Sequence, residues 1–88
     1  MRKGSARAAM RDRVRRSNRL AVRRNESLSV SVLCECGRAC KTWLMVDADL
    51  YWRAGSRHRY VVAPGHALPG TDKVVLEKRD YDVIEAAA

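Results

Sequence analysis

The chain is 88 residues long, carries a formal net charge of +8 and contains three cysteines. This length allows one domain, whose core alone leaves a thin stability margin, so we expect a metal, a disulfide or a partner to reinforce it. Because the sequence shows neither the apolar stretch of a secretory signal nor the ~20 apolar residues of a membrane span, we expect a cytoplasmic protein that does not enter a membrane.

The positive charge is concentrated in the first 24 residues. This segment holds ten Arg and Lys and one acidic residue, Asp12, which is +9, whereas residues 25–88 hold eight bases and nine acids, which is −1. Its Ala, Arg and Leu content predicts a helix. Because the apolar stripe of this helix is broken, we expect a frayed arm that becomes firmer against an anionic partner. We therefore divide the chain into a basic helical arm, residues 1–24, and a small domain, residues 25–88.

The rest of the chain is predicted to form short strands around one short helix. Apolar residues that alternate with serines, glycines that mark turns, and aspartates that can cap a helix carry this prediction. The predicted elements are strands over residues 28–32, 42–46, 60–63, 73–78 and 81–85 and a helix over residues 50–55. We expect hairpins between the first two and the last two strands. The sequence thus predicts an α+β fold, in which the basic helix is followed by a small, mainly antiparallel sheet.

Three cysteines lie within seven residues of one another in the turn between the first two strands: Cys34, Cys36 and Cys40. An odd and tightly clustered set favours metal thiolates over a disulfide framework, although a redox-active pair remains an alternative. Structural zinc takes four Cys or His ligands at tetrahedral corners. The hairpin is therefore expected to be a zinc knuckle that staples the domain, with a fourth ligand from elsewhere.

His66 is the favoured fourth ligand, because it lies in a Pro-Gly-His turn where Gly65 permits a sharp bend. His58 lies between two arginines, whose positive field disfavours a dication. His58, Glu35, Asp47 and a water molecule nevertheless remain candidates for the fourth position. We expect a structural ion, because three thiolates make a poor Lewis acid and the sequence lacks the zinc-deaminase signature.

Three blocks of the sequence, Val32–Gly37, Tyr60–His66 and Tyr81–Glu85, occur in this order together with a further cysteine. In these blocks the chain resembles a family of small, largely uncharacterised zinc-binding proteins of the actinobacterial type, with C-E-C…C and V-V-x-P-G-H motifs. The resemblance covers about residues 25–86 and implies zinc ligation by Cys34, Cys36, Cys40 and His66, but brings no established activity. The loop before the third cysteine is one residue shorter than the family's usual pattern, and the N-terminal segment is more basic.

The density of arginine in the first 24 residues is typical of a segment that lies along phosphates. We predict a non-enzymatic zinc module that contacts nucleic acid or a nucleoprotein machine, such as a ribosome or a transcription complex. The candidate nucleic-acid ligands are Arg11, Arg13, Arg15, Arg16, Arg19, Arg23 and Arg24.

The alternative function is that of a protein-interaction adaptor or small regulator, which binds an acidic surface or inserts an aromatic anchor. Trp43, Tyr51 and Trp52 are the candidate anchors, since aromatic residues dominate interface hot spots. We nevertheless expect these rings to fill the core, because the chain contains no Phe. An enzymatic role is not expected, since helix capping and turn formation account for the paired aspartates. The oligomeric state is left open.

Overall fold

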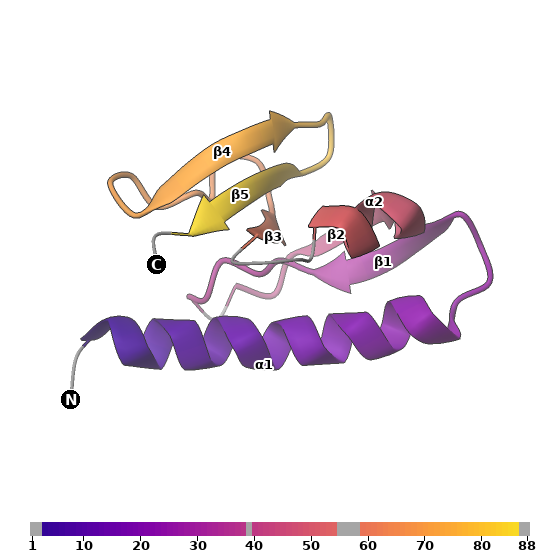
Figure 1. The fold of residues 1–88 in the computed structure, drawn as a ribbon, viewed down its shortest axis with the longest axis horizontal. Helices are drawn as coiled ribbons and strands as arrows, with labels where there is room; N and C mark the ends of the chain where they lie inside the picture. The colour runs from indigo at the N-terminus through magenta and orange to yellow at the C-terminus, as the bar shows by residue number, and fades with distance from the viewer. Residues whose placement is uncertain (1–2, 39, 55–58, 87–88) are drawn as a thin grey trace.

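The structure is a computed structural model that describes residues 3–38, 40–54 and 59–86 (Figure 1). Its elements in chain order are α1 (Lys3–Arg24), β1 (Ser29–Leu33), β2 (Trp43–Asp47), α2 (Ala48–Ala54), β3 (Arg59–Val62), β4 (Asp72–Glu77) and β5 (Asp82–Ala86). The predicted α+β fold is confirmed, and each predicted element is present within two residues of its expected bounds; Gly55, the expected end of the short helix, lies outside the described residues.

The strands form two antiparallel sheets rather than one. β1 pairs with β2, with Val30 opposite Val46 and Val32 opposite Leu44, and these alternate residues are the buried ones. The second sheet has the order β3-β5-β4, so the predicted C-terminal hairpin is present. In Figure 1 this second sheet lies above the β1–β2 hairpin, with α1 running beneath it.

Helix α1 packs against the rest of the molecule along most of its length. Val22 is 3% exposed and belongs to the core. The Asn18 side chain binds the open edge of β1, because its amide oxygen accepts from the Leu33 N–H and its amide nitrogen donates to the Leu33 carbonyl. This corrects the expectation of a frayed arm. The helix docks largely through polar side chains that bind backbone groups. The prediction considered only the apolar stripe of the helix and so missed these contacts.

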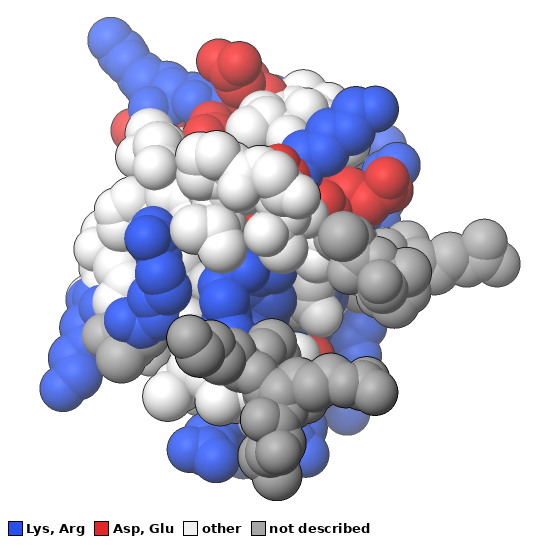
Figure 2. Space-filling view, turned by 90° about the vertical axis from the view of Figure 1, so that its left-hand side faces the viewer, with Lys and Arg blue, Asp and Glu red and all other residues white. Residues whose placement is uncertain are grey.

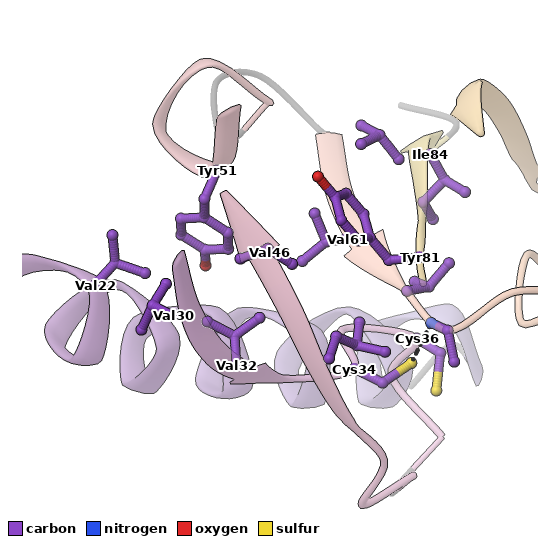
Figure 3. Close-up of a cluster of buried hydrophobic side chains, with 14 residues drawn as sticks. Val22, Val30, Val32, Cys34, Cys36, Val46, Tyr51, Val61, Tyr81 and Ile84 are labelled. Atoms are coloured by element: carbon purple, nitrogen blue, oxygen red, sulfur yellow. Dashed lines mark hydrogen bonds between the residues drawn. The ribbon is translucent and has the colours of Figure 1, made fainter. Parts of the chain in front are cut away.

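The core is built from valines of both sheets, Ile84 and two tyrosines, Tyr51 and Tyr81 (Figure 3). Trp43 and Trp52 are 64% and 40% exposed, so the expectation that the tryptophans fill the core is wrong, whereas the expectation for Tyr51 is confirmed. No helix within the described residues is both long enough and apolar enough to cross a membrane.

Candidate metal centre

The fold brings the three cysteines and His66 together. One donor atom from each of Cys34, Cys36, Cys40 and His66 lies within 4.8 Å of all the others. The sulfur atoms of Cys34 and Cys40 are each 3.5 Å from the Nδ1 of His66. Figure 3 shows the sulfur atoms of Cys34 and Cys36 at one end of the buried core. This group can hold a metal ion.

Two of the donor separations are close to those expected around a four-coordinate zinc ion. With Zn–S and Zn–N bonds of about 2.3 and 2.1 Å at tetrahedral angles, a sulfur and a nitrogen ligand are separated by about 3.6 Å. The two sulfur–nitrogen distances at His66 are 3.5 Å. Four protein donors are also the number that a structural zinc site takes.

Backbone pairing positions the cysteine turn. The Cys34 N–H donates to the Thr42 carbonyl at 2.8 Å, which continues the β1–β2 ladder up to the first ligand. Gly37 then turns the chain with a φ of 81°, a conformation that L side chains rarely adopt. A Cβ at Gly37 would also lie 2.8 Å from the Arg7 side chain. The turn therefore needs glycine both for its conformation and for its contact with α1.

A second turn delivers the histidine, as the sequence predicted. The His66 N–H donates to the Ala63 carbonyl at 3.0 Å, and Gly65 between them has a φ of 81°. The same segment contacts the first ligand directly, because the Ala63 N–H donates to the Cys34 sulfur at 3.2 Å. This N–H is aimed at the sulfur and would stabilise a thiolate there.

The cysteines differ in how readily they ionise. Burial raises the pKa of the Cys34 thiol to about 12. Burial also opposes ionisation of Cys40, but hydrogen bonds from Thr42 and from the two other thiols outweigh it and lower the pKa of Cys40. A metal ion binds the thiolate form of cysteine and displaces the thiol proton. Metal binding would therefore stabilise the Cys34 thiolate, which burial disfavours.

Two arginines of α1 bind the backbone of the cysteine turn. Arg7 Nε donates to the Cys36 carbonyl at 3.0 Å, and Arg11 donates to the Glu35 and Cys36 carbonyls at 2.8 and 3.1 Å. Both guanidinium groups also pair with the buried Asp72 carboxylate, at 3.0 and 3.1 Å. The metal site is therefore joined to α1 and to the start of β4. Neither Arg7 nor Asp72 was predicted from the sequence, because they are 65 residues apart and carry no local signal of pairing.

Glu35 lies between two cysteines but is not a ligand. Its side chain is 0% exposed, and its carboxylate accepts from the Tyr51 hydroxyl at 2.6 Å, the Asn18 amide at 2.9 Å and the Val61 N–H at 3.0 Å. Burial and the nearby Glu35 charge raise the pKa of Tyr51, so the phenol stays protonated and donates. Asp47 is exposed on β2 and does not belong to the converging group either. His58 lies outside the described residues.

Two of the seven candidate nucleic-acid ligands are buried. Arg11 and Arg15 are 4% and 8% exposed, and their guanidinium groups lie 4.7 and 4.6 Å from the centre of the Tyr60 ring. Arg15 also donates to the Arg59 carbonyl. The prediction that Arg11 and Arg15 lie on the exposed surface of the helix is therefore wrong. Their spacing, four residues apart and followed by Asn18 and Val22, was the signal that one face of α1 is buried. The other five are exposed: Arg13, Arg16, Arg19, Arg23 and Arg24.

Comparisons with protein-family models, with curated proteins and with solved structures find no match to this chain. The family resemblance of its motifs accordingly stays a prediction. The metal centre rests on the geometry and the donor chemistry of its own four residues.

Proposed function

We propose that the protein is a structural-zinc module whose helix α1 contacts nucleic acid, either alone or within a nucleoprotein complex. Zinc is the metal we propose because three cysteines and one histidine whose donor atoms converge in this way are a set typical of structural zinc sites. The ion would staple a core too small to be robust alone. No catalytic step is assigned to it, since its four protein ligands leave no position for a substrate or a reactive water.

The observation that carries nucleic-acid contact is the exposed basic face of α1. Arg13, Arg16 and Arg19 line a shallow cleft of ≈ 480 Å³ on the helix surface. The single acidic residue of the helix, Asp12, also lines this cleft, and its carboxylate accepts a hydrogen bond from the Tyr60 hydroxyl. In Figure 2 Lys and Arg project from the upper part of the view and from its lower edge, where α1 lies, whereas the acidic side chains gather mainly in the upper part. Such a surface binds phosphates by releasing their counterions.

Salt dependence tests this proposal. Exposed arginines can be neutralised without disturbing the core, so we would compare wild type with the triple variant Arg13→Gln/Arg16→Gln/Arg23→Gln on labelled RNA and DNA. The slope of log affinity against log salt should fall by about 2–3, because each lost phosphate contact removes nearly one unit. A matched control neutralises three exposed bases near β4: Lys73→Gln/Lys78→Gln/Arg79→Gln. Binding through α1 would be refuted if the two variants lost the same amount of affinity. It would also be refuted if the α1 variant kept the wild-type slope of log affinity against log salt.

A protein-interaction adaptor is the second candidate, and the exposed residues of β2 favour it. Trp43 and Met45 share the outer face of the β1–β2 sheet and are 64% and 54% exposed. A partner anchored by Trp43 would bind with little salt dependence and would be lost on Trp43→Ala. Tyr51 no longer qualifies as an anchor, because it is 1% exposed.

A further inference from the structure

An exposed tryptophan lies beside the basic face of α1. Trp52, on α2, is 40% exposed, and the guanidinium carbon of Arg19 lies 6.0 Å from the centre of its ring. The ring also meets Tyr51 edge to face, with centroids 6.2 Å apart and planes at 73°. Tyr51 is itself fixed by its hydrogen bond to the buried Glu35. Trp52 is therefore held at the seam between the two helices with part of its ring open to solvent.

The same arginine joins this ring to the basic cleft. Arg19 lines the cleft together with Arg13 and Arg16, so an aromatic surface and several phosphate-binding groups adjoin one another. Tyr60, the other aromatic residue next to α1, is less open, because two guanidinium groups lie over its ring at 4.7 and 4.6 Å, whereas Trp52 has one such group, at 6.0 Å. Within the described residues, Trp52 is thus the ring that the basic face leaves more open.

We propose that this seam, formed by Trp52, Arg13, Arg16 and Arg19, binds single-stranded nucleic acid. This inference rests on the proposed function and narrows its partner class. A base stacks on the open part of the Trp52 ring, and the arginines contact the flanking phosphates. Aromatic platforms beside a basic groove bind unpaired strands with little sequence preference, because every base has a π-face. A duplex keeps its base faces inside the stack, so it can use the arginines but not the tryptophan.

Tryptophan fluorescence gives a direct readout. The chain has two tryptophans, so Trp43→Leu leaves Trp52 as the sole one. We would titrate this variant with an oligothymidylate of about 12 nucleotides and with a mixed-sequence duplex of about the same length, within the site size of single-strand binders. The single strand should quench Trp52, and the duplex should not. Trp43→Leu itself should keep wild-type affinity for both probes, since Trp43 lies on β2 outside the seam.

Substitution of Trp52 then separates stacking from charge. Trp52→Leu should lower affinity for the oligothymidylate about tenfold and leave duplex affinity and the salt slope unchanged. Trp52→Phe, which keeps an aromatic face, should restore most of the loss, whereas a merely structural defect would weaken both probes together. Binding of both probes with no effect of Trp52→Leu would overturn the single-strand inference and leave the basic-face proposal intact. Binding of neither probe would overturn both.

Discussion

Glu35 shows how one residue can organise the elements around the candidate metal centre without being one of its four donors. In an extended chain residues i and i+2 point to one side and the residue between them to the other. The Cys34 and Cys36 sulfur atoms therefore point into the candidate metal centre. The Glu35 carboxylate points the other way and accepts hydrogen bonds from α1, α2 and β3. A buried carboxylate is tolerated only when such partners satisfy it. The C-E-C motif thus encodes both a pair of ligands and the polar centre of the fold.

Asp72 is the second buried carboxylate, and its charge depends on α1. Burial alone would raise the pKa of Asp72, but hydrogen bonds from Arg11, from the Leu68 N–H and from Arg7 outweigh it and lower that pKa. A carboxyl group whose pKa is lower in the folded state stabilises the fold above its unfolded pKa of about 4. This contribution is lost as the pH falls through the lowered, folded-state pKa.

The Asp72→Asn variant should therefore show a pH-dependent loss of stability. At pH 7 its free energy of unfolding should fall by about 3 kcal/mol, because Arg7 and Arg11 lose a buried partner. The difference from wild type should narrow as the pH falls from about 4 through the lowered pKa of folded Asp72, below which the wild-type carboxyl group is neutral as well. Urea denaturation across this range measures both effects. Glu77→Gln, an exposed change on the same strand, is the control. If the difference in unfolding free energy between Asp72→Asn and wild type stays constant with pH, the ionised Asp72 carboxylate does not stabilise the fold.

At the scale of elements, α1 is held by polar contacts arranged along one face. Arg7 and Arg11 bind the cysteine turn, Asn18 binds the edge of β1, and Val22 closes the core at the far end. Because Asn18 occupies both the N–H and the carbonyl of Leu33, it also blocks that position of the strand edge from pairing with another chain. The helix is thus both a structural layer and the carrier of the exposed arginines.

Asn18→Ala tests this docking. It removes both hydrogen bonds to Leu33 and one to Glu35, so buried groups lose their partners and stability should fall by about 2–3 kcal/mol. Amide hydrogen exchange should accelerate in α1 more than in the β4–β5 hairpin, because the helix loses its hold first. The neighbouring exposed change Ser17→Ala is the matched control. If both variants exchange alike, Asn18 does not anchor the helix.

At the scale of the whole molecule, the chain is packed as one body. Its radius of gyration is 12.1 Å, close to the value of about 12 Å expected for a folded chain of this length, even though α1 extends the longest dimension to 40 Å. A core of this size leaves little reserve of stability, and the four-residue metal centre lies where α1, the β1–β2 hairpin and the His66 turn meet. Loss of the proposed zinc ion would loosen all three.

Metal removal should accordingly destabilise the entire fold. Wild-type protein purified without chelator should hold one zinc per chain, and a chelator should lower Tm by more than about 10 °C, reversibly on adding zinc. Elemental analysis and thermal unfolding followed by circular dichroism measure the two effects. His66→Ala should bind zinc more weakly, and His58→Ala should keep it. Reduced protein that contains no metal and melts identically with chelator would rule out the zinc staple.

The sequence by itself predicted the elements and the four residues that converge at the candidate metal centre, because both predictions came from local patterns. Alternating valines predicted β1, and the glycine in the Pro-Gly-His turn pointed to His66 rather than His58 or Glu35. Contacts between residues of different elements could not be predicted in this way. Arg11 was predicted to bind phosphate, because the residues near it in the chain give no sign that it pairs with Asp72, 61 residues away.

Only the tertiary structure decided which polar and aromatic side chains are buried. Arg11, Arg15 and Glu35 lie inside, whereas Trp43 and Trp52 lie outside. A buried charge is stable only where distant residues satisfy it, and a tryptophan is exposed only where no other element covers it. Both conditions depend on how the helices and sheets pack, which no local pattern contains.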